Sequence, residues 1–339
     1  MRGHGVDPTA SAGRAWSRLD GVAIPGGPAH TARGGVVSRL PYRPPLQAGA
    51  LLGWLAARAA PGVEAVSGGV YRRSLRLPNS TAVAELSLTG DDVTLRLHGA
   101  DPADLPAARA LCRRAADLDT DPAEVDTALA ADPLLAPMVA ARPGLRVPGT
   151  VDGFELACRA ILGQQITVAG ARTLAGRMVA AFGRPLPVPR GQISHLFPTA
   201  DRLAGASQTD LTGLGLTRAR AGALLALAGA VAGGRLVLDR GADHHEATRR
   251  LLALPGVGPW TAAYVAMRAL GDTDALPAGD LILRRALPGA QSTRGAQRGQ
   301  VTAAALTAHA ARWRPFRAYA AVHLWANTVD PGDDTGGTR

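Results

Sequence analysis

The sequence predicts an α+β fold, in which a small antiparallel sheet with helices precedes an all-helical bundle. Three segments, at residues 70–77, 82–88 and 93–97, alternate apolar and polar residues as half-buried strands do. From residue 102 onward, apolar residues recur at helical spacing, and short Gly or Pro breaks separate the segments. A chain of 339 residues is long enough for two or three domains.

The N-terminal elements are predicted within residues 36–148, an α+β domain with connecting helices. Residues 36–42 read as a strand, and residues 47–58 as a helix with Leu51 and Leu55 on one face. Residues 1–35 are rich in Gly, Pro, Ala and Ser without periodicity, so we expect a disordered or linker-like N-terminus. We expect residues 331–339 to form a disordered tail.

The helical portion is predicted to span residues 149–330. Its expected helices lie at residues 152–162, 168–182, 192–203, 218–232, 246–254, 259–270, 281–286, 300–312 and 318–327.

The basic composition bears on possible partners. All 37 basic residues are Arg, the formal net charge is +10, and most of the excess lies between residues 151 and 330. A polyanionic partner and an ordinary solvated Arg-rich surface both fit this charge. The absence of lysine from the sequence excludes catalysis through a lysine Schiff base.

Cysteine content and hydropathy exclude other classes. The two cysteines, Cys112 and Cys158, form no CxxC pair, which excludes a four-Cys iron–sulfur cluster or zinc finger. No apolar run approaches the ~20 residues of a membrane span, and the first residues lack a signal-peptide hydrophobic region. We therefore expect a cytoplasmic protein with no membrane contact.

The clearest motif is LPGVGPWTA at residues 254–262. A helix ends at Leu254, two glycines permit a tight turn, and Pro259 opens the next helix. Free N–H groups at a helix start favour an anion, so Gly256, Val257, Gly258, Pro259 and Thr261 are candidate contacts to a DNA phosphate. A plain Gly-capped corner between two helices is the alternative interpretation.

Asp280 follows in LPAGDLILR and precedes a predicted helix. It can serve as the N-cap of that helix. It can also be a catalytic carboxylate, because cleavage of a glycosidic bond develops positive charge on the sugar. Arg284 in the first turns of this helix suits a DNA-facing surface.

Aromatic residues are scarce, at 4% of the chain, yet several fall near these motifs. Trp260 and Tyr264 share one helix face, Trp325 lies on the last helix, and Trp54 lies on the N-terminal helix. Ordinary core packing explains such spacing. The alternative is a pocket for a flipped base, whose rings would favour cationic bases through cation–π attraction.

Gln164 and Gln165 follow the Gly that ends the predicted helix at 152–162. A flipped base leaves a gap in the duplex that a side chain must fill. Gln165 is the candidate plug, and Gln164 can face the pocket. A helix C-cap with solvated Gln side chains remains possible.

The sequence resembles the DNA-3-methyladenine glycosylase II (AlkA) family. The matching stretches, in family order, are LPYRPPL at 40–46, LLGWLAARA at 51–59, VDGFELACRAILGQQITVAGAR at 151–172, LPGVGPWTAAY at 254–264, LPAGD at 276–280 and RWRPFRAYAAVHLWA at 312–326.

The resemblance implies an N-terminal domain like the TATA-binding protein and a helix-hairpin-helix glycosylase bundle. It implies Asp280 as catalytic residue, Trp260, Tyr264 and Trp325 in the base pocket, Trp54 at its edge, and Gln165 as the wedge. It also implies a monomer that acts on duplex DNA with alkylated bases and needs no cofactor. A sodium or potassium ion can be held in this family by hairpin carbonyls, here those of Leu252, Leu254 and Gly256.

Three positions depart from the family pattern. Gly279 stands where a second acidic residue can occur, and Leu281 and Ala326 stand where tyrosines can line the pocket. These differences leave the expected reaction unchanged and bear on the range of accepted bases.

Two other functions compete with this one. Glycosylase/lyases of the 8-oxoguanine or endonuclease III type use a Lys just after the hairpin, where this chain has Trp260. A non-catalytic helix-hairpin-helix DNA-binding module would need the hairpin but neither Asp280 nor the aromatic set.

Overall fold

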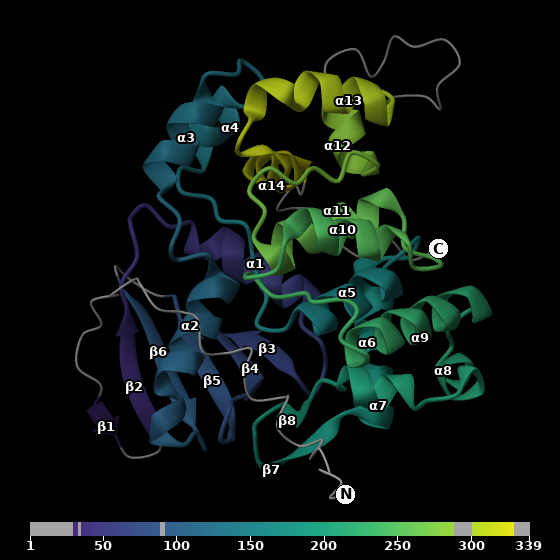
Figure 1. The fold of residues 1–339 in the computed structure, drawn as a ribbon. Helices are drawn as coiled ribbons and strands as arrows, with labels where there is room; N and C mark the ends of the chain where they lie inside the picture. Colours follow the sequence, from purple (N-terminus) through teal and green to yellow (C-terminus); the bar gives the residue numbers. More distant parts are fainter. Residues whose placement is uncertain (1–29, 33–34, 89–91, 288–299, 329–339) are drawn as a thin grey trace, which may run out of the picture.

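The computed structural model describes residues 30–32, 35–88, 92–287 and 300–328, and within them the α+β prediction is confirmed. Most of the N-terminal segment predicted to be disordered, residues 1–29, lies outside the described residues, as does the predicted tail at 331–339. Figure 1 shows the sheet on one side of the molecule and the helical portion beside and above it.

The N-terminal portion is built on a six-stranded antiparallel sheet with strand order β1-β2-β6-β5-β4-β3. The strands are β1 (His30–Ala32), β2 (Gly35–Leu40), β3 (Glu64–Ser67), β4 (Val70–Arg76), β5 (Thr81–Ser87) and β6 (Val93–His98). Strands β1 and β3 had no counterpart among the strands predicted from the sequence. Strand β1, which pairs with β2, lies within residues 1–35, the segment that was expected to lack structure.

Two helices pack on this sheet and close its core. They are α1 (Ala48–Arg58) and α2 (Leu105–Ala116), and the short η2 (Pro102–Asp104) precedes α2. Leu51 and Leu55 of α1 are buried in one cluster with Leu75, Leu86 and Leu95 of the strands. The alternating pattern therefore placed the apolar side chains on the face that the helices cover.

The helical portion fills the rest of the molecule, with α5–α9 on one side and α12–α14 near α3 and α4 on the other (Figure 1). Its elements are α3 (Pro122–Ala130), α4 (Ala136–Ala141), α5 (Gly153–Leu162), α6 (Val168–Phe182), α7 (Ala200–Ala204), α8 (Gln208–Gly213), α9 (Arg218–Ala232), α10 (His244–Leu252), α11 (Pro259–Val265), the π-helix η3 (Ala266–Leu270), α12 (Leu281–Ala286), α13 (Ala303–His309), η4 (Ala310–Trp313) and α14 (Arg317–Thr328).

The helix predicted at residues 192–203 is wrong. The chain instead forms a hairpin of β7 (Arg184–Arg190) and β8 (Ile193–Leu196), and α7 begins only at Ala200. Ile193 bridges to Gly62 and packs with Val83 of the sheet. Burial against the N-terminal portion thus selects the extended form, and a local pattern cannot show that contact.

Helix α5 lies in the centre of the larger core and leads directly to the predicted wedge. Nine of its ten residues are buried, and Asp152 caps its start through Glu155 N–H. Buried residues of α9 and α11 pack into the same core. A helix buried on nearly all sides holds the loop at its C-terminus in a defined place.

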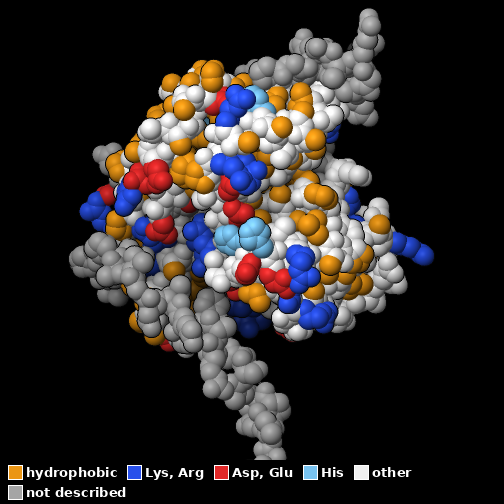
Figure 2. Space-filling view, turned by 45° about the horizontal axis from the view of Figure 1, so that its top comes forward, with side chains coloured by type: hydrophobic (Ala, Val, Ile, Leu, Met, Phe, Trp, Pro, Cys, Tyr) orange, Lys and Arg blue, Asp and Glu red, His pale blue; other side chains and the backbone are white. Residues whose placement is uncertain are grey.

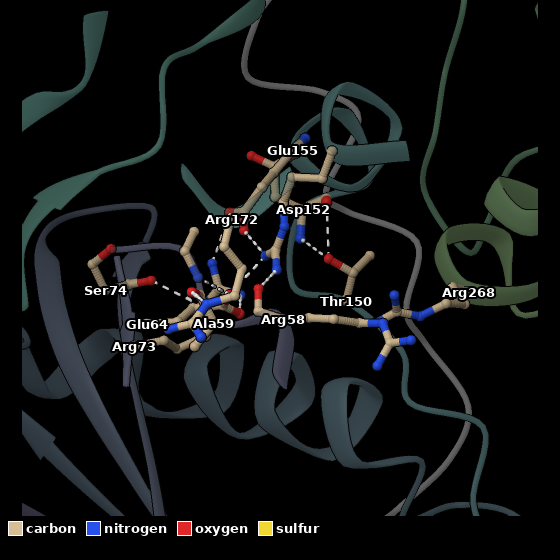
Figure 3. A network of polar contacts seen from close by, with 12 residues as sticks. Arg58, Ala59, Glu64, Arg73, Ser74, Thr150, Asp152, Glu155, Arg172 and Arg268 are labelled. Atoms are coloured by element: carbon tan, nitrogen blue, oxygen red, sulfur yellow. Dashed lines mark hydrogen bonds and ion pairs between the residues drawn. The ribbon is translucent and has the colours of Figure 1, made fainter. Parts of the chain in front are cut away.

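A buried ionic network joins the sheet to α5 (Figure 3). Arg73 of β4 lies 2.8 Å from Glu155 and 3.2 Å from Glu64. Arg159 of α5 lies 2.7 Å from Glu64 and 2.8 Å from Glu155. Arg159 also donates to the carbonyl of Arg58. The C-terminal end of α1 is therefore tied to the helix that precedes the predicted wedge, Gln165.

The buried His323 should make the free energy of unfolding depend on pH. His323 on α14 is 1% exposed, and neither ring nitrogen has a hydrogen-bond partner in the described part of the chain. Burial, with a contribution from Arg142, lowers the pKa of His323 to about 4 from its ordinary 6.5. The unfolded chain therefore takes up a proton first as the pH falls, and the free energy of unfolding drops by roughly 3 kcal/mol between pH 6.5 and pH 4.

His323→Leu removes this titratable group, so the free energy of unfolding of the variant should depend less on pH. Urea unfolding of both proteins at about pH 7.5 and about pH 5 should show wild type losing ~2 kcal/mol more than the variant. Equal losses in the two proteins would mean that His323 is solvated or paired in solution.

No helix in the described part of the chain is long and apolar enough to cross a membrane. The face seen in Figure 2 carries arginine side chains interspersed with acidic ones, and no single basic stripe crosses it. The positive net charge alone therefore does not mark a binding surface.

Candidate active site

The predicted hairpin joins α10 to α11. Its two glycines differ in conformation: Gly256 has φ +77°, whereas Gly258 is the extended N-cap of α11 with φ −93°. Of the two glycines, only Gly256 uses the positive φ that glycine permits. Val257 between them is 6% exposed and anchors the turn, while Pro259 opens α11 as predicted.

The two glycines should consequently respond differently to alanine. A Cβ at Gly256 would lie 2.8 Å from Ala223 Cβ, in a backbone conformation that alanine avoids, whereas a Cβ at Gly258 meets no atom within 4 Å. Gly256→Ala should lower stability and weaken binding to damaged and undamaged DNA alike, because phosphate contacts carry no sequence information.

Gly258→Ala is the matched control for this prediction. It should leave the melting temperature near that of wild type, so that any loss of DNA affinity reports the approach of a DNA backbone to the helix start. Melting curves and fluorescence-anisotropy titrations with damaged and undamaged duplexes measure both effects. A loss confined to damaged DNA would contradict the phosphate role.

Two of the three hairpin carbonyl groups predicted to hold a monovalent cation accept a hydrogen bond within the protein. Gly256 O accepts from Gln164 Nε2 at 3.0 Å, and Leu254 O accepts from Val257 N–H at 3.2 Å. A carbonyl oxygen has two lone pairs, so each can still bind a cation. The ion at these two carbonyls and that of Leu252 stays a prediction.

Asp280 is the N-cap of α12, and two indole N–H groups also donate to its carboxylate. Its Oδ1 accepts from the N–H groups of Ile282 and Leu283, at 2.9 and 3.2 Å, and so caps α12. Trp260 Nε1 donates to Oδ2 at 2.9 Å, and Trp325 Nε1 donates to Oδ1 at 3.1 Å. Four donors thus hold the half-buried carboxylate in one orientation between two indole rings.

The predicted aromatic residues form one continuous row. Trp260 stacks on Tyr264 with ring centroids 5.1 Å apart, Tyr264 meets Trp325 edge-on at 6.4 Å, and Trp325 contacts Trp54 at 5.5 Å. Trp325 and Tyr264 are buried, whereas Trp260 and Trp54 are half-buried. Residues from α1, α11 and α14 therefore meet beside Asp280, as the sequence analysis predicted.

Two arginines that the sequence analysis did not single out adjoin this row. Arg58 Cζ lies 3.5 Å from the Trp54 ring centroid, and Arg268 Cζ lies 5.2 Å from that of Tyr264. Burial raises the pKa of Tyr264, but the guanidinium groups of Arg268 and Arg58 outweigh it, so that the pKa is lowered overall. The only earlier signal was Arg58 within the LLGWLAARA stretch.

The two glutamines occupy the loop between α5 and α6. Gln164 turns inward, where its Nε2 donates to Thr261 Oγ1 and to Gly256 O, both at 3.0 Å. Gln165 is exposed and adopts φ +56°, which is uncommon for a residue other than glycine. Gln164 thus braces the hairpin and buries Thr261, while Gln165 projects into solvent as a wedge must.

The remaining predicted position, Arg284, and the three departures from the family pattern differ in their surroundings. Arg284 Nε donates to Val301 O at 2.7 Å, so its guanidinium is partly engaged within the protein. Leu281 is 43% exposed, and a Cβ at Gly279 would make an ordinary 3.6 Å contact with Trp260 Cβ. Ala326 packs at the margin of the helical core.

Two family models match adjacent parts of the chain. The AlkA N-terminal domain matches residues 37–152, and the HhH-GPD superfamily base excision DNA repair protein matches residues 158–309. The first ends just before α5 begins, and the second contains the loop of Gln164 and Gln165, the hairpin and Asp280.

Curated relatives agree with these matches. The chain is 46% identical over 325 residues to the probable bifunctional transcriptional activator/DNA repair enzyme AlkA of Mycobacterium tuberculosis, covering 96% of this chain and 62% of that protein. It is 36% identical over 288 residues to DNA-3-methyladenine glycosylase 2 of Escherichia coli, covering 84% of this chain and 95% of that enzyme.

Solved structures share the fold. The 3-methyladenine DNA-glycosylase from Archaeoglobus fulgidus superposes with a TM-score of 0.71 at 23% identity, covering 86% of this chain and 97% of that one. The 8-oxoguanine glycosylase/lyase of Clostridium acetobutylicum in complex with duplex DNA superposes with a TM-score of 0.69 at 18% identity, covering 90% and 98%. At these identities the likeness establishes architecture.

The match to the Escherichia coli enzyme extends over nearly its whole length. This chain is therefore a member of the AlkA-type DNA-3-methyladenine glycosylase family, within the helix-hairpin-helix superfamily of base excision repair proteins.

Proposed function

We propose that this protein is a monofunctional DNA glycosylase that extrudes an alkylated base from duplex DNA and hydrolyses its N-glycosidic bond. One observation carries the proposal. The carboxylate of Asp280 is fixed between the indole N–H groups of Trp260 and Trp325, within a row of aromatic rings and next to the hairpin. The bases named for the relatives, 3-methyladenine above all, supply the substrate class.

The chemistry follows from that arrangement. The hairpin N–H groups hold a phosphate, the exposed Gln165 fills the gap in the duplex, and the extruded base meets the aromatic row. The bond to the base breaks with its electron pair leaving on the base, and positive charge develops on the sugar. Asp280 stabilises that charge, and water then adds to the sugar and leaves an abasic site.

We propose hydrolysis without strand cleavage. A lyase needs an amine that forms a covalent adduct with the sugar, and this sequence contains no lysine. Trp260, which holds Asp280, stands in the place of the lysine used by lyase relatives. We further propose that the protein acts as a monomer on DNA in the bacterial cytoplasm, and that no cofactor takes part.

A monovalent cation at the hairpin would have a supporting role. The carbonyls of Leu252, Leu254 and Gly256 would hold sodium or potassium, whose positive charge would strengthen the phosphate contact. Exchange of these ions for tetramethylammonium at constant ionic strength should weaken DNA binding if the site is occupied.

Incubation with methylated duplex DNA tests the main proposal. The purified protein should release free alkylated bases and leave strands that break only on later treatment with alkali. Duplex binding without base release would indicate a non-catalytic DNA-binding module. Strand breakage without alkali, or a covalent adduct trapped by borohydride, would contradict the monofunctional assignment.

A further inference from the structure

The glutamine loop, residues 164–167, connects α5 to α6 and carries the predicted wedge. Both of its ends are fixed within the protein. At the start, the half-buried side chain of Gln164 donates to the hairpin. At the end, Thr167 caps α6. Gln165 and Ile166 are therefore exposed between two fixed points.

Gln165 holds a backbone conformation that costs free energy. Its φ of +56° lies in the left-handed region, which residues with a Cβ rarely adopt. Such a conformation persists only where surrounding contacts impose it, and residues of this kind cluster at binding and catalytic sites. A contact that imposes it on Gln165 should act on the peptide group just before that residue.

Arg220 of α9 makes that contact. Its Nη2 donates to the carbonyl of Gln164 at 2.5 Å. This carbonyl belongs to the same planar peptide unit as the N–H of Gln165, so the hydrogen bond fixes the plane from which φ of Gln165 is measured. Arg220 is half-buried and keeps its charge at any working pH, and a charged donor makes a stronger hydrogen bond than a neutral one.

The same face of α9 supports the hairpin. Helix α9 lies beside α5 (Figure 1). A Cβ on Gly256 would lie 2.8 Å from Ala223 Cβ, so the hairpin packs directly on α9. Ala223 is three residues after Arg220 and shares its side of the helix. One surface of α9 thus positions both the glutamine loop and the hairpin predicted to bind phosphate.

We propose, resting on the function proposed above, that Arg220 is a positioning residue for base extrusion. By holding the Gln164 carbonyl, it keeps Gln165 in its left-handed conformation before DNA binds. The Gln165 side chain then enters the gap in the duplex without reorganisation of its loop. When Arg220 is removed, the loop relaxes toward conformations that Gln165 prefers, and binding of the extruded state is weakened. Binding of intact DNA does not need the wedge and is unchanged.

Binding to an intact duplex and to a duplex with a tetrahydrofuran abasic analogue opposite 2-aminopurine tests this role. Wild type should favour the abasic duplex and change the 2-aminopurine fluorescence as Gln165 fills the gap. Arg220→Met should lower this preference by about tenfold. Arg220→Lys should keep most of it, because an ammonium group can also donate to the carbonyl.

Arg218→Met is the matched control. It removes an equal charge from an exposed position in the same turn of α9. Any loss of general electrostatic attraction should affect both duplexes alike, so the preference for the abasic duplex should stay at the wild-type value. An Arg218→Met protein that loses the preference as Arg220→Met does would show that charge, and not the hydrogen bond to Gln164, is the cause.

A double-mutant cycle with Gln165→Ala shows whether Arg220 acts through the wedge. The protein with both Arg220→Met and Gln165→Ala should show the same preference as Gln165→Ala alone. Losses that add would mean that Arg220 acts independently of Gln165 and would refute the proposal. So would an Arg220→Lys protein that behaves like Arg220→Met, or an Arg220→Met protein with the wild-type preference, when their circular dichroism matches wild type.

Release of alkylated bases from methylated duplex DNA separates this inference from the proposed function. Wild type that releases bases but shows no preference for the abasic duplex would refute the positioning role and leave the glycosylase assignment intact. A preference that follows the expected pattern without any base release would support the positioning role and contradict the proposed enzyme activity.

Discussion

Asp280→Asn is expected to slow base release by about 100-fold or more, which corresponds to ~3 kcal/mol of lost stabilisation of the sugar cation. Asparagine matches the shape of aspartate and is an equally good N-cap, so α12 should persist. Binding of duplex DNA should also persist, because the hairpin is unchanged. Single-turnover kinetics and anisotropy titrations measure the two properties separately.

Asp243→Asn is the matched control. Asp243 caps α10 through Glu246 N–H in the way that Asp280 caps α12, but no indole donates to it in the described structure. It should therefore report only the effect of changing an N-cap, with rates near wild type. An Asp280→Asn protein that releases bases at the wild-type rate would exclude Asp280 as the catalytic carboxylate.

Trp260 is expected to show two separable effects. Trp260→Phe keeps a ring against Tyr264 but removes the donor that holds Asp280 at 2.9 Å. Loss of one hydrogen bond to a charged group costs about 1.5–3 kcal/mol, so release of every base should slow by roughly 10- to 100-fold. Trp260→Ala removes the ring as well and should add a further loss for cationic bases.

Release of 7-methylguanine and hypoxanthine by these two variants separates the role of the Trp260 ring from that of its N–H group. If Trp260→Ala slows both bases by the same additional factor, the ring contributes packing and not cation–π attraction. If Trp260→Phe releases bases as fast as wild type, then the indole N–H does not position the carboxylate.

Much of the fold could be predicted because local signals agreed with tertiary contacts. Thr167 and Thr217 cap α6 and α9 at the predicted starts of those helices, and apolar spacing carried each to its end. The β7–β8 hairpin could not be predicted in this way. Its first strand, RPLPVPR, contains three prolines, and its second is held by contacts with Gly62 and Val83 far away in sequence.

The candidate site also has features that the sequence could predict and features that it could not. Asp280, Trp260 and Trp325 could be chosen as candidates because their residue types suit the chemistry and the family resemblance brought them together. Their indole-to-carboxylate hydrogen bonds depend on the relative placement of α11, α12 and α14, which no local pattern encodes. Arg58 escaped notice for a similar reason, because an arginine at the end of a helix usually lies in solvent.

The buried network of two glutamates and two arginines has a consequence for how the protein evolves and can be divided. Glu155 and Arg159 belong to the glycosylase portion, but their partners Glu64 and Arg73 belong to the sheet. A chain beginning at residue 150 would lose the two ion pairs that cross between the portions and would expose to solvent the face of α5 that they cover. We therefore expect the sheet and the helical portion to fold together, so that recombination between relatives should exchange both.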